Sequence, residues 1–228
     1  MNRVRIWDLP TRLFHWALVL CVIGLFVTGR IGGDLMNWHF RLGYAALTLV
    51  LFRVVWGFIG GYWSRFARFL PTPGRILRYL RGQARPEDTA GHNPLGACSV
   101  FALLILVAAQ AITGLFSYDE IAFAGPLSGL VSDHAVDLAT RYHKAWGQPL
   151  IIGLVALHVL AIIVYTALKH HLFWPMIVGD KPLEADLAAA RDTAGARILA
   201  LVVLAILAAA VYALVTWGNT HGTAGFGY

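Results

Sequence analysis

HKAWGQPLIIGLVALHVLAIIVYTAL, residues 143–168, carries two histidines on one long apolar segment. On a continuous helix His158 follows His143 by about four turns, or roughly 22 Å along the axis. The two side chains are then about 60° apart around the axis, which puts them nearly on one face. A histidine in hydrocarbon is costly and usually functional, so this segment can supply one ligand at each of two depths. Pro149, between the two, predicts a kink that makes this facing approximate.

The composition is that of a membrane protein. The 228 residues are 58% hydrophobic and 13% charged, with a mean hydropathy of +0.66, which is too apolar for an ordinary soluble domain. A membrane-spanning helix needs about 20 apolar residues. Windows of about this length occur at Leu13–Thr28, Leu42–Ile59, Leu95–Phe116, Pro149–Leu168 and Ile198–Trp217. We therefore predict an all-α fold, a transmembrane helical bundle with a four-helix core and a fifth, C-terminal transmembrane helix.

The first window resembles a signal peptide, but Arg30 follows it and no small-x-small cleavage site is apparent, so we expect a retained helix. Cys21 and Cys98 lie in apolar windows without CxxC spacing. This argues against covalent c-type haem, a zinc knuckle or a disulfide scaffold, and we expect both cysteines to be buried apolar residues.

The net charge of +6 is distributed unevenly along the chain. With the N-terminus inside, thirteen basic residues fall on the cytoplasmic side and four on the other, with Arg53 inside a span. This positive-inside bias predicts a cytoplasmic N-terminus with the C-terminus on the opposite side of the membrane, and it argues against a nucleic-acid partner. The Arg-rich segment Tyr62–Asn93 is either an interfacial segment with a short amphipathic helix after Pro73 or a solvated basic loop.

Four histidines inside the spans form two pairs of matched depth. His39 and His143 are placed toward the periplasm, and His15 and His158 toward the cytoplasm. Two imidazoles from facing helices are what a six-coordinate, electron-transferring haem iron needs, so we predict an outer and an inner haem b. For any one of these residues, an ordinary buried histidine bonded to a neighbouring helix is the alternative.

Haem propionates are anionic, so we expect arginines near the predicted ligands to neutralise them. The candidate arginines are Arg12, Arg41, Arg53 and Arg141. Arg53 fits either a propionate or a quinone, and a snorkelling side chain is the alternative. His92 is expected at the mouth of the third helix, where it either binds quinone or a propionate or faces solvent.

Glycines are frequent in or near the spans. They are Gly24, Gly29, Gly43, Gly57, Gly114, Gly147 and Gly153. Their missing side chains make room for a flat macrocycle, although small-residue helix packing explains many of them equally well.

The ordered runs of the chain resemble the bacterial cytochrome b561 and nickel–iron hydrogenase cytochrome-b family. The runs are WDLPTRLFHW (7–16), HFRLGY (39–44), FRVVWGFIG (52–60) with ARF (67–69), GHNPLGA (91–97), HKAWG (143–147) through His158, and MIVGDKPL (176–183). The resemblance implies that His15, His39, His143 and His158 are the axial ligands of two b haems. It also implies that residues 1–183 form a dihaem domain, and that residues 184–228 comprise a cytoplasmic linker, the fifth helix and a periplasmic tail.

The resemblance further implies electron transfer between quinone and a partner redox protein. Expected partners are membrane lipid, quinone or quinol, and a periplasmic c-type cytochrome or a dehydrogenase or hydrogenase subunit. The first alternative is a superoxide:quinone oxidoreductase, in which Arg41, Arg141 and Lys144 steer the anion to the outer haem. The second is a structural anchor without a redox centre. The fifth span departs from the family's four-helix pattern.

Overall fold

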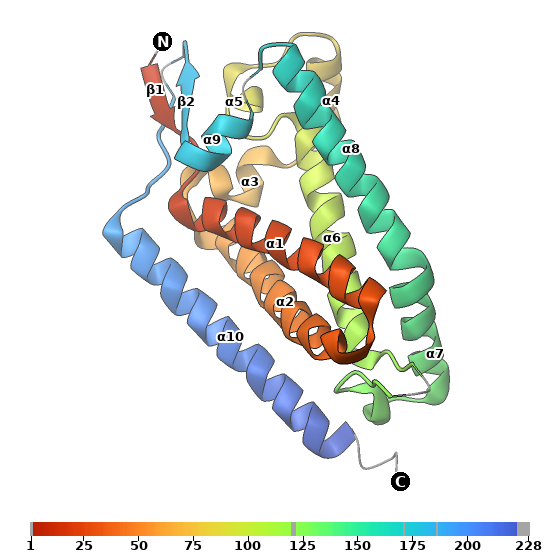
Figure 1. Ribbon diagram of the computed structural model, residues 1–228. Coiled ribbons are helices and arrows are strands. Elements are labelled where there is room, and N and C mark those ends of the chain that lie inside the picture. Colours follow the sequence, from red (N-terminus) through yellow and green to blue (C-terminus); the bar gives the residue numbers. More distant parts are fainter. Residues whose placement is uncertain (1, 120–121, 171, 186, 223–228) are drawn as a thin grey trace. The chain divides into compact units, whose positions relative to one another are not determined.

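The computed structural model describes residues 2–119, 122–170, 172–185 and 187–222, and this part of the chain is mostly helical (Figure 1). The long helices are α1 (Leu9–Ile31), α2 (Met36–Ile59), α6 (Pro94–Phe116), α8 (Gln148–Ala167) and α10 (Ala194–Gly222). Within these residues, five helical segments are long and apolar enough to cross a membrane. The predicted helical bundle with a fifth C-terminal helix is therefore confirmed, with helices that extend beyond most of the apolar windows. The last residues of the expected periplasmic tail, 223–228, lie outside the described residues.

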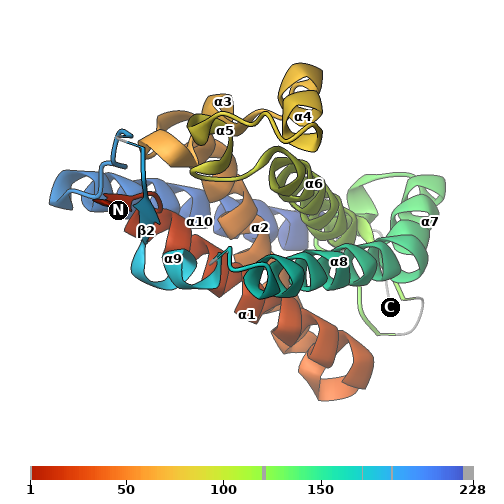
Figure 2. The same cartoon turned by 90° about the horizontal axis from the view of Figure 1, so that it is seen from above.

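Short helices connect the long ones. They are η1 (Gly33–Leu35), η2 (Tyr62–Ser64), α3 (Phe66–Phe69), α4 (Pro73–Leu80), α5 (Pro86–Thr89), η3 (Ser128–Leu130), α7 (Asp133–Arg141), η4 (Tyr142–Gly147) and α9 (Phe173–Val178). The expected helix after Pro73 is confirmed as α4, since proline at the first helical position has no amide hydrogen to lose. Helices α4 and α5 lie beside each other (Figure 2), joined by hydrogen bonds from Arg75 and Arg78 to Asp88 of 2.8 and 3.2 Å.

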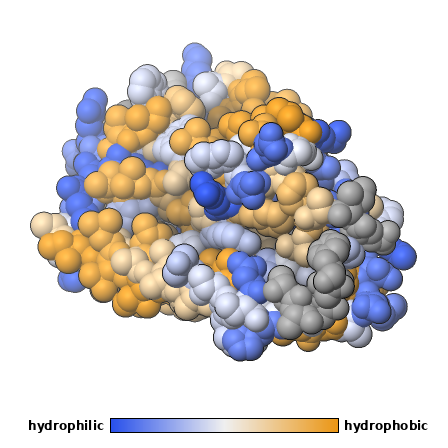
Figure 3. Space-filling model, turned by 60° about the horizontal axis from the view of Figure 1, so that its bottom comes forward, coloured by the Kyte–Doolittle hydropathy of each residue, from blue (hydrophilic) through white to orange (hydrophobic). Residues whose placement is uncertain are grey.

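The chain divides into two compact units. The first unit contains Met1–Trp16, Phe52–Leu103 and Leu154–Val203, and the second contains Ala17–Leu51, Leu104–Gly153 and Leu204–Tyr228. Large apolar side chains reach the surface in both units, as the hydrophobic areas of the face in Figure 3 illustrate. Leu20, Phe58 and Ile198 are each more than half exposed. A surface of this kind suits contact with lipid rather than with water. Cys98 also belongs to it, since the structure exposes this residue instead of burying it.

A small β-sheet in the first unit was not foreseen from the sequence. Strand β1 (Asn2–Arg5) pairs antiparallel with β2 (Asp180–Leu183) (Figure 1), and the amides of Ile6 and Trp7 both donate to the carbonyl of Gly179. Gly179 has a φ of 93°, and a Cβ there would lie 2.8 Å from the Trp7 carbonyl oxygen. Only glycine fits this turn without strain. The pairing holds the N-terminal residues against the segment that follows α9.

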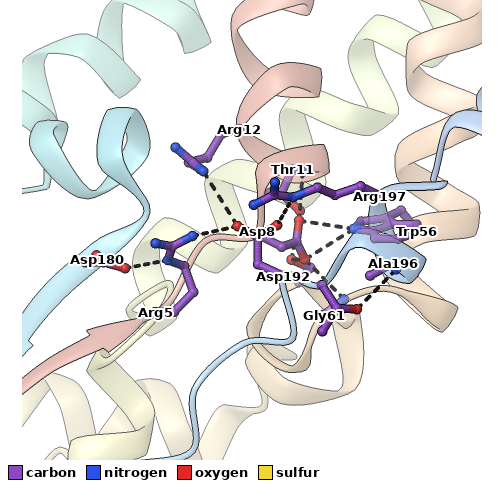
Figure 4. Close-up of polar contacts among 12 residues, drawn as sticks. Arg5, Asp8, Thr11, Arg12, Trp56, Gly61, Asp180, Asp192, Ala196 and Arg197 are labelled. Atoms are coloured by element: carbon purple, nitrogen blue, oxygen red, sulfur yellow. Dashed lines mark hydrogen bonds and ion pairs between the residues drawn. The ribbon is translucent and has the colours of Figure 1, made fainter. Parts of the chain in front are cut away.

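Asp8 organises the start of α1 (Figure 4). Its carboxylate is fully buried and accepts hydrogen bonds from the Thr11 amide at 2.8 Å, the Ser64 hydroxyl at 2.7 Å and the Gly61 amide at 3.1 Å. The Trp56 indole also donates to it, at 3.3 Å. The bond to Thr11 is an N-cap, which satisfies one amide at the helix start. A buried carboxylate with this many donors joins the start of α1 to the end of α2.

Asp192, which precedes α10, is surrounded by three arginines (Figure 4). Its carboxylate lies 2.6 Å from Arg5, 2.9 Å from Arg197 and 3.8 Å from Arg12, and its side chain is 5% exposed. Burial acts to raise the pKa of Asp192, but hydrogen bonds from Arg197, the Leu9 backbone and Arg5 together lower it below its usual value. The ionised form is therefore the stable one, and it ties the start of α10 to the strand and helix at the N-terminus.

We expect Asp192→Asn to lower the thermal midpoint of the purified protein by several degrees at pH 7, because three guanidinium groups lose their shared anion. The folded pKa of Asp192 is depressed, so its stabilisation is present above the unfolded value of about 3.9 and is lost as the pH falls through the folded pKa. The midpoint of the wild type should thus fall more steeply below about pH 4 than that of the variant. The exposed Asp137→Asn is the control, and an equal effect of both changes would contradict the proposed contact.

Candidate functional site

His39 and His143 meet in the second unit. His39 lies in the first turns of α2, and His143 lies in η4, the π-helical turn directly before α8. Their ring centroids are 6.2 Å apart and the ring planes are nearly perpendicular, at 86°. This is about the separation of two imidazoles whose nitrogens flank one metal ion at roughly 2 Å each. The pair predicted from matched depth is therefore brought together.

Backbone carbonyls orient both rings. His39 Nδ1 lies 3.1 Å from the carbonyl oxygen of Leu25, and His143 Nδ1 lies 2.9 Å from that of Gln110. A carbonyl can only accept, so each Nδ1 carries the hydrogen and each Nε2 keeps its lone pair for a metal. Histidines that bind a metal almost always donate their other ring hydrogen in this way. The arrangement fits haem ligation.

Gln110 holds His143 by a second bond that sequence reasoning missed. Its side-chain Nε2 donates to the backbone carbonyl of His143 at 2.9 Å, while its own carbonyl accepts from the His143 ring. The hint in the sequence is an amide side chain in the predominantly apolar span Leu95–Phe116, where a strongly polar group needs a partner.

The departure from α-helical geometry that Pro149 predicts takes the form of η4. Proline lacks an amide hydrogen and its ring crowds the carbonyl four residues earlier, which favours a widened turn at this point. Single π turns are frequent at functional sites, and this one contains His143.

Two of the predicted glycines adjoin the rings. A Cβ on Gly29 would lie 3.0 Å from His39 Cε1, and one on Gly114 would lie 2.9 Å from His143 Cε1. Real Cβ atoms hardly ever approach as closely as the one at Gly114 would, so a larger residue there displaces the imidazole, whereas at Gly29 the ring would need to shift only slightly. Gly153, in contrast, has nothing within 4 Å of such an atom.

His15 and His158 belong to the first unit, on α1 and α8. Both are partly buried, and they are close enough to influence each other electrostatically. The His15 ring packs edge-on against Trp16, at 5.0 Å between centroids. Its Nδ1 is buried and has no hydrogen-bond partner among the described residues, so its orientation relies on packing.

Arg53 is a buried cation in the same unit. Its side chain is 2% exposed, and neither terminal nitrogen has a hydrogen-bond partner among the described residues. The guanidinium lies over the rings of Phe66 and Phe69, at 4.7 and 5.7 Å from their centroids. Burying an unpaired cation costs free energy unless an anionic group neutralises it. A haem propionate is an anionic group of this kind. The donor set thus fits the cofactor.

His92 adjoins this cation and is not turned toward solvent. Its ring lies between Trp7 and Phe69, with centroid distances of 4.6 and 4.5 Å, and its Nδ1 is buried without a partner in the described part of the chain. It is within electrostatic range of Arg53, His15 and His158. The solvent-facing alternative for His92 is therefore wrong.

The other predicted arginines lie in different surroundings. Arg12 donates to the carbonyl of Ile177 and lies 3.8 Å from Asp192. Arg41 is exposed and stacks on Trp38, at 5.3 Å from the ring centroid, and Arg141 is exposed at the end of α7. Among the described residues, Arg53 is thus the predicted arginine whose two terminal nitrogens are both buried and unbonded, whereas in Arg12 only Nε is in that state.

Comparison with known proteins gives one family match. The model described as prokaryotic cytochrome b561 matches residues 6–179. Among similar curated proteins, a probable Ni/Fe-hydrogenase 1 B-type cytochrome subunit of Escherichia coli K12 is 28% identical over 141 residues, covering 50% of this chain and 60% of that protein. A probable Ni/Fe-hydrogenase B-type cytochrome subunit of Azotobacter vinelandii is 28% identical over 144 residues, with 51% and 60% covered. The corresponding protein of Cupriavidus necator is 28% identical over 196 residues, with 69% and 78% covered. No solved structure matches the chain.

We expect Gly114→Ala to alter the ligation of His143 while the fold is retained, because the ring moves to relieve the contact and the backbone need not. The measurement is the reduced absorbance spectrum and the haem content of the purified protein. Gly153→Ala is the matched control, since its new methyl group meets open space. Identical spectra for both variants would contradict the role assigned to Gly114.

Proposed function

Because the chain belongs to the prokaryotic cytochrome b561 family, integral membrane proteins of the b-type cytochrome class, we propose that it binds two haems and carries electrons between quinone and a partner redox protein. The observation that carries the proposal is the His39–His143 pair, 6.2 Å apart and with both Nδ1 atoms on backbone carbonyls. His15 and His158 are the second pair. When bound, haem b supplies a reversible one-electron centre in each unit.

The chain's own residues orient the imidazoles. Leu25 and Gln110 fix the outer rings, and Gly29 and Gly114 leave space beside them. Two imidazoles on one iron leave no position for oxygen, which suits electron transfer rather than oxygen chemistry.

Arg53 is assigned to a propionate of the inner haem. Its two unbonded terminal nitrogens form the fork that matches a carboxylate, and His92 adds a further buried ring nitrogen nearby. Arg12, Arg41 and Arg141 remain candidates for the same role at the two sites.

A hydrogenase is the partner that we favour. The similar proteins of three bacteria carry the name of hydrogenase cytochrome subunits. The matched segment covers 60% of the length of the E. coli and Azotobacter proteins, so their partner is transferred here as a proposal. A c-type cytochrome or another dehydrogenase subunit is the alternative.

The proposed setting is the bacterial inner membrane, with the N-terminus cytoplasmic and the C-terminus periplasmic. Residues 1–183 form the dihaem part, and 184–228 add the linker, the fifth helix and the tail. The uneven distribution of arginines and lysines supports this orientation.

The purified protein should contain two haems b per chain, reducible by a quinol in proteoliposomes. His39→Ala and His158→Ala should each lower the haem content to one and stop electron transfer between quinol and an external acceptor. The pyridine haemochrome assay counts the haems, and the exposed His134→Ala is the control. Two haems retained in His158→Ala would refute the ligand scheme, and rapid reduction by superoxide without a partner would select the superoxide alternative.

Arg53→Leu should make the reduction potential of one haem more negative, because a nearby cation favours the reduced form and its loss favours the oxidised form. Arg53→Lys keeps the charge and should shift the potential less. Redox titration of the purified protein measures both centres, with the exposed Arg81→Leu as control. Unchanged potentials in Arg53→Leu would remove this residue from the haem environment.

A further inference from the structure

A pocket of about 360 Å³ lies in the first unit, and none of the four predicted ligands lines it. Two of the ordered sequence runs meet there although neither supplies a haem ligand. Gly91 and Asn93 of the run 91–97 line it on one side, and Lys181 and Leu183 of the run 176–183 line it on another. The pocket therefore gives these runs a shared location.

The Lys181 ammonium has no ion-pair partner among the described residues. Its ammonium donates to the carbonyls of Thr89 and Ala90, at 2.9 and 3.1 Å, which leaves one of its three hydrogens unused. No carboxylate of the described residues forms an ion pair with it. Burial lowers the pKa of this ammonium, as expected for a positive charge that nothing neutralises.

Among the described residues, the acidic side chains near the pocket in the sequence are already engaged or face solvent. Asp180 pairs with Arg5, and Asp88 pairs with Arg75 at 2.8 Å. Glu184 is exposed. The protein itself thus offers Lys181 no neutralising partner in the part that the structure describes, and an anionic ligand would provide one.

Other donors line the same pocket. Tyr79 and Tyr165 share a hydrogen bond between their hydroxyl groups, and His170 packs against the Tyr165 ring at 5.8 Å. Burial and the contact with Tyr165 raise the pKa of Tyr79 to about 12, so this phenol stays neutral, and one of the two hydroxyl hydrogens of the pair is left for a ligand. Hydroxyl, imidazole and ammonium groups together are suited to the oxygens of a phosphate.

Exposed apolar side chains flank this region on two short helices. Leu77 and Leu80 of α4 are 48% and 65% exposed, and Phe173 and Trp174 of α9 are 47% and 62% exposed. Amphipathic segments with exposed leucine and tryptophan lie at the membrane surface, and basic pockets between membrane helices bind anionic headgroups there.

We propose that this pocket binds the phosphate headgroup of an acidic phospholipid, with Lys181 as its cationic contact and His170 at its side. The acyl chains would extend along the apolar surface. This binding does not require either haem, so the lipid proposal and the electron-transfer proposal can fail separately.

Lys181→Gln should weaken the binding of phosphatidylglycerol to the haem-loaded, delipidated protein by about tenfold or more, the effect expected for losing one charged hydrogen bond. Native mass spectrometry of the protein in detergent measures the bound lipid, with phosphatidylcholine as the uncharged comparison. The matched control is Lys169→Gln, because Lys169 is exposed and does not line the pocket.

A second variant guards against misfolding, since Lys181 also holds two backbone carbonyls. His170→Glu breaks no side-chain hydrogen bond that the structure records and places a negative charge at the pocket, so it too should reject phosphatidylglycerol. An unchanged haem spectrum verifies the fold. Equal affinity for the two lipids, saturation by inorganic phosphate alone, or displacement of the lipid by a quinone analogue in wild type and Lys181→Gln alike would each overturn the proposal.

Discussion

The hydrogen bond from an imidazole Nδ1 to a backbone carbonyl is the constraint on which the candidate electron-transfer site depends. In an apolar interior a free histidine ring has no fixed orientation, and a metal needs its Nε2 lone pair aimed at one point. The backbone carbonyls of Leu25 and Gln110 fix the orientation of the His39 and His143 rings. Both acceptors belong to the main chain of helices, so the rings are fixed to the most rigid part of the fold.

The two units orient their histidines by different means. In the second unit, hydrogen bonds and two adjoining glycines define the positions of the rings. In the first unit, His15 relies on packing against Trp16, while charge is concentrated nearby in Arg53. One pair of histidines is thus oriented mainly by backbone acceptors and by shape, and the other lies near a buried cation. Two haems held in these environments would differ in potential, because charge and burial both tune haem iron.

The sequence was sufficient for features that depend on local pattern. The apolar windows predicted the five spans that the structure contains. The depth of His39 and His143 within these spans predicted the pair that the structure brings together. What sequence reasoning missed depends on contacts between distant residues. Asp192 pairs with Arg5, 187 residues earlier in the chain. Gln110 of α6 donates to the backbone carbonyl of His143 in η4. Asp8 was also missed, although its bond to the Thr11 amide is a local N-cap contact.

The fifth helix is part of the packed structure in each unit, although the span Ile198–Trp217 has no histidine. In the first unit, Arg197 and Asp192 fix its start to the N-terminal strand through Arg5. In the second, Val211 and Val215 are buried in a cluster with Leu47, Leu115 and Leu127. A helix whose only role was to bind a partner subunit would not need packing contacts in both units. The helix therefore supports the surroundings of the candidate sites, and its remaining exposed face is what lipid or another subunit can contact.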